Sequence, residues 1–128
     1  MTRNQYRPAI RRAIKPGRDV PEKAIRLIDA AVSDHPKDAS LWHKRAILIQ
    51  LGPESGPHTL EDALASYFTA LYLDPQNPEI VEDIGHFFDA VMGHEKEGQR
   101  WLRRGRRMKA NNTSDRIAHP GRVRKRSR

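Results

Sequence analysis

Small and large apolar residues recur along this chain at helical spacing. Three sets share steps of four and three residues, and in the first two a proline follows five residues later. The sets are Ala24, Ile28, Ala31 and Pro36; Ala63, Tyr67, Ala70 and Pro75; and Gly98, Leu102 and Gly105. Such steps place side chains on one helical face, where small residues allow a neighbouring helix to approach closely. The prolines are expected to end the helices.

The segments between these sets carry helical stripes of their own. One stripe is Trp42, Ala46 and Ile49, and the other is Val81, Ile84, Gly85 and Phe88. Asp38 and Asn77 are suited to cap helix starts, and Thr59 with Asp62 resembles a capping box. We therefore expect helices near 21–34, 39–51, 60–73, 78–92 and 95–109. The segment 52–58 has two glycines and two prolines, which predict a loop.

These patterns predict an all-α fold of about five helices, arranged as antiparallel pairs. The residues expected to be buried together are Trp42, Ala46, Ala63, Tyr67, Ala70, Ile84, Gly85 and Phe88. Trp101 is also expected in the core, because a large apolar residue on an amphipathic stripe is usually buried. The alternative is that Trp101 stacks on a nucleic-acid base among the neighbouring arginines.

Charge divides the chain into an acidic body and two basic ends. The net charge of +8 combines +5 over residues 1–20, −8 over 21–95 and +11 over 96–128. We expect a basic, flexible arm at 1–20, a helical domain at 21–110 and a basic, flexible tail at 111–128. Basic ends of this kind are typical of polyanion binding, although they also serve only to solubilise.

The N-terminal segment admits three interpretations. It lacks acidic residues over its first eighteen positions, and Tyr6, Ile10, Ala13 and Ile14 can share a helical face. Pro8 and Pro16 are expected to limit any helix to about two turns. The segment is then a basic arm, a degraded repeat helix, or a transit peptide, which would place the protein in the mitochondrial matrix rather than the cytoplasm.

Little in the sequence points to catalysis or to a cofactor. Cysteine is absent, and the six histidines lack the spacing of metal ligands. Gly-rich phosphate loops and nucleophile motifs are missing, and no apolar run approaches the roughly 20 residues of a membrane span. We expect a cytoplasmic protein that is not an enzyme and that binds neither metal nor cofactor.

The order of these residues resembles the tetratricopeptide repeat, a unit of two antiparallel helices. Trp42, Ala46, Ile49, Ala63, Tyr67, Ala70 and Pro75 match one repeat. Val81, Ile84, Gly85, Phe88, Gly98, Leu102 and Gly105 match a second, and Ala24, Ile28, Ala31 and Pro36 match half of another. The resemblance covers roughly residues 20–110, with Arg45 standing where the family has leucine.

The resemblance implies a helical solenoid with a concave groove that binds a protein partner. It places in the groove Ser40, His43, Lys44, Ile47 and Gln50 from one repeat, and Glu79, Glu82, Asp83, His86 and Asp89 from the next. Four of these residues are acidic, so a basic or neutral peptide is favoured over an acidic one. The alternative is that the carboxylates form an ordinary solvated helix face.

Two functions follow from these patterns. The first is a non-enzymatic adaptor that binds a protein through the groove. The second is an RNA- or ribonucleoprotein-associated protein that binds phosphate through its arginines. The predicted polyanion surface comprises Arg100, Arg103, Arg104, Arg106, Arg107, Arg122, Arg124, Lys125, Arg126 and Arg128.

Overall fold

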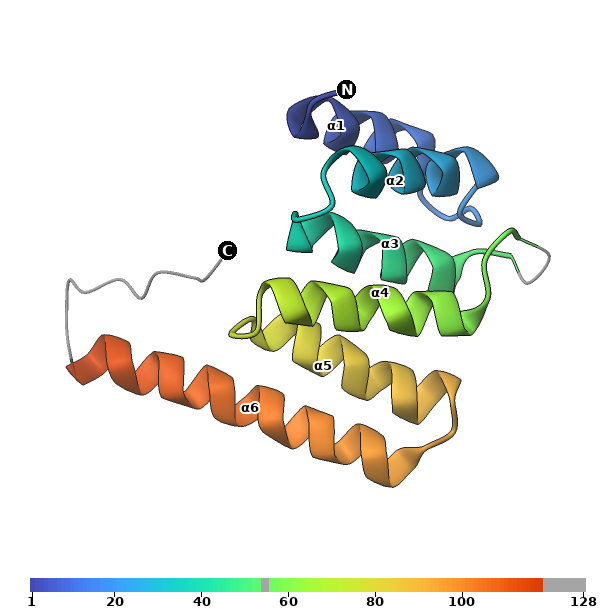
Figure 1. Ribbon diagram of the computed structural model, residues 1–128. Coiled ribbons are helices and arrows are strands. Elements are labelled where there is room, and N and C mark those ends of the chain that lie inside the picture. The colour runs from blue at the N-terminus through green and yellow to red at the C-terminus, as the bar shows by residue number, and fades with distance from the viewer. Residues whose placement is uncertain (54–55, 119–128) are drawn as a thin grey trace. The chain divides into compact units, whose positions relative to one another are not determined.

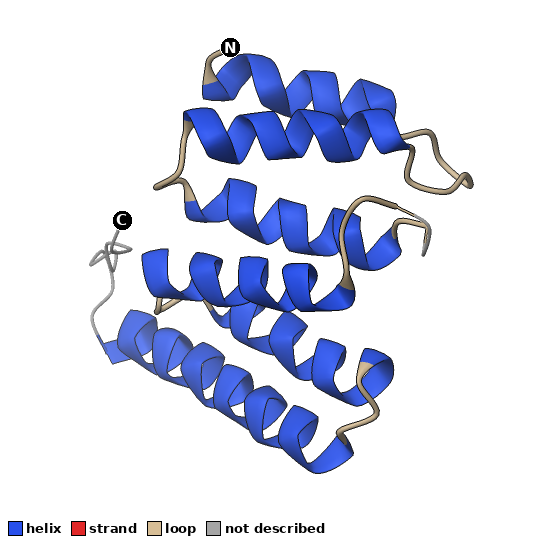
Figure 2. Ribbon diagram, turned by 45° about the vertical axis from the view of Figure 1, so that its right-hand side comes forward, coloured by secondary structure: helices blue, strands red, loops and turns tan. Residues whose placement is uncertain are grey.

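The chain is helical in every regular element of the residues that the structure describes. The structure is a computed structural model, and it describes residues 1–53 and 56–118, the last five of these through their backbone alone. Figure 2 shows helices and loops, and none of the described residues forms a strand. Two compact units follow one another along the chain, Met1–Leu73 and the described part of Asp74–Arg128. The predicted all-α class is thereby confirmed.

The first unit contains four helices that lie side by side in chain order (Figure 1). They are α1 (Arg3–Ala13), α2 (Glu22–Asp34), α3 (Ala39–Leu51) and α4 (Leu60–Leu73). The bounds of α3 and α4 are those predicted. Both small–large–small triplets of this unit are buried, at Ala24, Ile28 and Ala31 in α2 and at Ala63, Tyr67 and Ala70 in α4.

Helix α1 was not among the five predicted helices, and it corrects the expectation of an arm over residues 1–20. Thr2 and Gln5 form a capping box, and Tyr6 and Ile10 are buried in the core of the first unit. The helix continues through Pro8 to Ala13, so it is longer than the two turns that the prolines were expected to allow. The proline removes one backbone hydrogen bond near the helix start. Burial of the two apolar side chains next to it offsets that loss.

A polar contact joins α1 to the end of α2. The Tyr6 hydroxyl donates a hydrogen bond to an Asp34 carboxylate oxygen. This hydrogen bond lowers the pKa of Asp34 and raises the pKa of Tyr6, because it favours the charged carboxylate and the neutral phenol. This hydrogen bond holds α1 against the end of α2, and the buried Ile10 side chain adds an apolar contact in the same core.

The second unit contains α5 (Pro78–His86), a π-helical turn η1 (Phe87–Val91) and α6 (Glu95–Ala118). Helices α5 and α6 pack against each other at glycines. A Cβ atom at Gly98 would lie 2.7 Å from the carbonyl oxygen of Gly85, and one at Gly85 would lie 2.8 Å from Cγ of Leu102. The close approach predicted for these small residues is confirmed.

The second unit differs from the prediction in two places. The segment expected as one helix over 78–92 changes to a π-helical turn at Phe87, so the fully buried aromatic is Phe87 rather than Phe88. Helix α6 continues to Ala118, into the segment expected to be a tail. Nothing between Lys109 and Ala118 breaks a helix, and the next proline is Pro120.

Three aromatic side chains expected in the core are only partly buried. Trp42, Phe88 and Trp101 each remain partly accessible to solvent. The Trp42 indole nitrogen donates a 2.7 Å hydrogen bond to the Pro36 carbonyl, which holds the ring at the edge of the first unit's core. A buried indole needs such a partner, and here the partner lies in a surface turn.

Candidate functional site

A groove of about 400 Å³ lies between α1 and α3 in the first unit. Its apolar surface comes from Ile10 and Leu41, both 2% exposed, and from the partly buried Ile14. The polar part of the lining is formed by Arg7, Arg11, Ser40 and Lys44. The groove therefore combines an apolar floor with three cations, and no carboxylate belongs to its lining.

Asp38 lies beneath one of these cations and neutralises part of the charge. Its carboxylate is 3.8 Å from Arg7 and 3.6 Å from Arg3, and it accepts a 2.6 Å hydrogen bond from the Ser40 hydroxyl. Burial favours the neutral acid, but the hydrogen bonds from Ser40 and Leu41 and the charge of Arg7 outweigh it, so the pKa of Asp38 is lowered. Arg7 also donates a 2.6 Å hydrogen bond to Ser40.

The two cations farther from Asp38 are not neutralised in this way. Arg11 and Lys44 are exposed, and neither forms an ion pair with any residue that the structure describes. Burying their charge against a neutral ligand would cost free energy, whereas an anionic group would be stabilised between them.

The α3 residues predicted for partner binding do not all reach this groove. Lys44 lines it, together with Ser40. The Gln50 side-chain oxygen instead accepts a 2.7 Å hydrogen bond from the Tyr67 hydroxyl of α4, and the His43 ring lies 6.0 Å from the Tyr67 ring. Ile47 is partly buried outside the groove lining. His43, Ile47 and Gln50 therefore lie outside the lining of this groove.

The predicted acidic surface belongs to α5 and η1 of the second unit. Only Glu79 and His86 of this set are exposed. Glu82, Asp83 and Asp89, three of the four carboxylates expected in the groove, are partly buried. Glu82 lies over Gly105 of α6 and pairs with Lys109 at 2.5 Å. This hydrogen bond raises the pKa of Lys109. Part of the acidic set thus serves packing between α5 and α6.

Arginines cover the side of α6 that faces away from α5. All five predicted positions in the described part of the helix are exposed. They are Arg100, Arg103, Arg104, Arg106 and Arg107. The remaining predicted positions, Arg122, Arg124, Lys125, Arg126 and Arg128, lie outside the described residues.

An ionic network that the sequence did not indicate joins α2, α3 and α4. Arg45 donates a 2.9 Å hydrogen bond to Asp29 of α2 and a 2.5 Å hydrogen bond to the buried Ser66 hydroxyl of α4. Asp29 also lies 2.6 Å from the His58 ring. The signal in the sequence was Arg45 itself, a charged residue at a position where the repeat pattern has leucine.

Although this network contains serine, histidine and aspartate, it lacks the order of a nucleophilic triad. A triad needs a hydrogen bond between the serine hydroxyl and the histidine. Here the Ser66 hydroxyl donates to the Asp62 carbonyl at 3.0 Å and accepts from Arg45. The geometry is that of a bridge between three helices.

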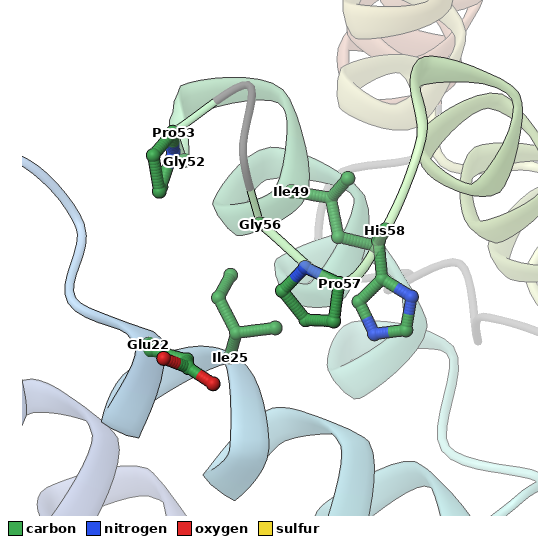
Figure 3. Close-up of a pocket in the computed structure, with 8 residues that line it drawn as sticks. All are labelled: Glu22, Ile25, Ile49, Gly52, Pro53, Gly56, Pro57 and His58. Carbon is green, nitrogen blue, oxygen red and sulfur yellow. The ribbon is translucent and has the colours of Figure 1, made fainter.

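A second pocket, of about 280 Å³, lies beside this network (Figure 3). It is lined by Glu22, Ile25, Ile49, Gly52, Pro53, Gly56, Pro57 and His58. Glu22 pairs with Arg26 at 3.2 Å, and His58 contacts Asp29 and Asp62. The two ionisable side chains of the lining, Glu22 and His58, therefore both already contact charged side chains of the same chain.

No protein family, curated protein or solved structure matches this chain. Among the described residues, no group of histidine, aspartate and glutamate is placed to hold a metal ion. Across the same residues, none of the helices has both the length and the apolar content needed to cross a membrane.

Proposed function

We propose that this chain is a non-enzymatic protein-interaction adaptor built from tetratricopeptide-like helix pairs. Support comes from the first unit, where consecutive helices pack side by side and the small–large–small triplets lie at buried contacts. The groove between α1 and α3 is the binding site in this proposal. Its two walls are the helices that would come first in their pairs.

The observation that carries the proposal is the composition of this groove. An apolar floor of Ile10 and Leu41 under Arg7, Arg11 and Lys44 fits an amphipathic segment with apolar and acidic side chains. Apolar contact supplies affinity, and charge complementarity supplies specificity and orientation. The partner proposed for this groove is therefore acidic. The preference for basic or neutral ligands predicted from the acidic residues of α5 and η1 concerns a different surface, and it stays a prediction.

A defined peptide tests the groove. The probe is a fluorescent amphipathic peptide whose leucines and glutamates recur at helical spacing. Its binding to the full chain is followed by fluorescence anisotropy. We expect Arg11→Glu with Lys44→Glu to weaken binding at least about tenfold, which corresponds to about 1.4 kcal/mol. The matched control is Arg12→Glu with Lys23→Glu, which makes the same charge change at exposed positions outside the groove.

Two results would contradict the proposal. Equal losses in the groove variant and in the control would mean that only net charge matters. Equal binding of a peptide with lysine in place of glutamate would show that the groove does not select an acidic partner.

A further inference from the structure

Helix α6 separates its packing residues from its arginines. Gly98, Leu102 and Gly105 are buried toward α5, while the arginines are exposed on the opposite side. Arg103 and Arg107 are one helical turn apart, about 6 Å along the axis, as are Arg100 and Arg104. The result is a strip of fixed positive charge on a regular element.

Most of this charge has no counter-charge nearby. Arg100 lies 3.8 Å from Glu97, and Lys109 is paired with Glu82. Arg103, Arg106 and Arg107 form no ion pair with the residues that the structure describes. Like charges so close together repel one another, and binding of a polyanion relieves that repulsion.

A row of aromatic rings lies in the same unit and meets the strip at Arg104. The Phe88 ring lies nearly parallel to Trp101, with centroids 6.5 Å apart and planes at 13°. The Phe88 ring is also nearly parallel to the His94 ring, with centroids 6.3 Å apart and planes at 16°. Arg104 lies over the Trp101 ring at 5.3 Å. His94 is exposed, so the row ends at a ring on which another planar group can stack.

The combination distinguishes nucleic acid from other polyanions. Single strands are bound by cationic side chains along the backbone and by aromatic side chains under the bases. An acidic protein surface would use the arginines but has no need of the ring row. The surface around His94 is lined by Glu95 and Glu97 together with Lys96 and Arg100, so its charges balance and an uncharged base can be accommodated there.

We infer that the second unit binds single-stranded nucleic acid. The phosphates contact Arg103, Arg106 and Arg107 on α6, and a base stacks at the His94 end of the row formed with Phe88 and Trp101. This surface is separate from the groove of the first unit and does not depend on the adaptor proposal. Binding is expected to show little sequence preference, because every base can stack and no base edge is read.

The test uses the full chain and a fluorescent oligoadenylate RNA of about 12 nucleotides, within the usual site sizes. Anisotropy is measured between about 50 and 200 mM salt, where phosphate contacts change affinity most. Arg103→Gln with Arg107→Gln should weaken binding about tenfold at low salt and reduce the salt slope by about 1.4, or 0.7 per phosphate. Both arginines are exposed, so the fold should not change.

The matched control removes two cations from the other unit. Arg12→Gln with Arg18→Gln lowers the net charge equally, and both positions are exposed. We expect this control to lose much less affinity than the α6 variant. Equal losses, or an α6 variant that binds as well as the parent, would overturn the assignment to α6.

An abasic oligomer of the same length tests the aromatic row without altering the protein. It keeps the phosphates but offers nothing to stack. Loss of stacking on one base should weaken binding about fivefold or more. Equal affinity for the abasic and the normal oligomer would reduce the surface to a general polyanion site and overturn the nucleic-acid proposal.

Discussion

Arg45 shows how one residue connects three helices. Its guanidinium bridges Asp29 and Ser66, and its side chain is only 15% exposed. Removing one partner from a largely buried ionic contact leaves the other groups poorly satisfied. The cost of losing Arg45 should therefore exceed that of losing an arginine from a solvated pair.

We expect Arg45→Met to lower the free energy of unfolding by about 1–3 kcal/mol. Arg26→Met is the control, because Arg26 pairs with Glu22 on one helix with both side chains about two-thirds exposed, and such pairs contribute at most about 0.5 kcal/mol. Urea unfolding followed by circular dichroism gives both values. A cost for Arg45→Met no larger than that of the control would mean that the bridge adds nothing to stability.

Asp38 makes the first unit sensitive to acid. Its pKa is lowered in the folded chain, so it contributes stability above its unfolded pKa of about 3.9, and this contribution is lost as the pH falls through the folded value. Asp38→Asn keeps an oxygen that can cap α3 but does not titrate. We expect the parent to be more stable than the variant near pH 6, with the difference shrinking below about pH 4.

Urea unfolding of both proteins at the two pH values checks this expectation. Other carboxyl groups with lowered pKa values, such as Asp34 and Asp62, are present in both proteins and cancel in the comparison. A constant difference between the two proteins at every pH would show that Asp38 acts through its hydrogen bonds and not through its charge.

At the scale of elements, the contact between α5 and α6 depends on the absence of side chains. A Cβ at Gly98 meets the Gly85 carbonyl and the backbone nitrogen of Asp89, which cannot move away without shifting the helix. A Cβ at Gly105 meets Cγ of Glu82 at 2.5 Å, a flexible side chain that can rotate. The same substitution should therefore be costly at Gly98 and much less so at Gly105.

We expect Gly98→Ala to destabilise the second unit by about 1–3 kcal/mol, the usual cost of overpacking. Gly105→Ala should be near neutral, because a gain of up to about 1 kcal/mol in helix propensity offsets the displacement of Glu82. Thermal unfolding of the two variants beside the parent measures the difference. Comparable melting temperatures for the two variants would mean that the helices separate to accept either methyl group.

At the scale of the whole molecule, the two units bury apolar surface unequally. The described residues of the second unit form a single helix pair with its π-helical turn. The first unit has four helices, and three of them, α1, α2 and α3, pack around a cluster that includes Tyr6, Ile28 and Leu41. Regions with less buried apolar surface open more often.

We therefore expect the backbone amides of α5 and α6 to exchange hydrogen faster than those of α2 and α3. Hydrogen–deuterium exchange read by mass spectrometry resolves the two sets. Uniform protection across all these helices would instead indicate that the chain opens as one cooperative unit.

Most of the fold, but less of the candidate site, could be predicted from patterns in the sequence. Caps and small residues at helical spacing act locally, so α3, α4 and the glycine contact of α5 with α6 could be predicted from them. Helix α1 was only one of three interpretations of its segment, because Pro8 argued against a longer helix while the burial of Tyr6 and Ile10 depends on α2. The groove beside α1 was missed for the same reason, and Arg45 finds its partners only once three helices are packed.

Each unit contains one of the two tryptophans of the sequence, Trp42 in the first and Trp101 in the second. An arginine lies near each ring, at 5.7 Å for Arg45 and 5.3 Å for Arg104. The molecule thus carries a separate intrinsic fluorophore in each unit. With Trp42→Phe the tryptophan emission reports only the unit that contains α6, and with Trp101→Phe only the unit that contains the groove. Ligand titrations followed by tryptophan emission can then be assigned to one surface without attaching a dye.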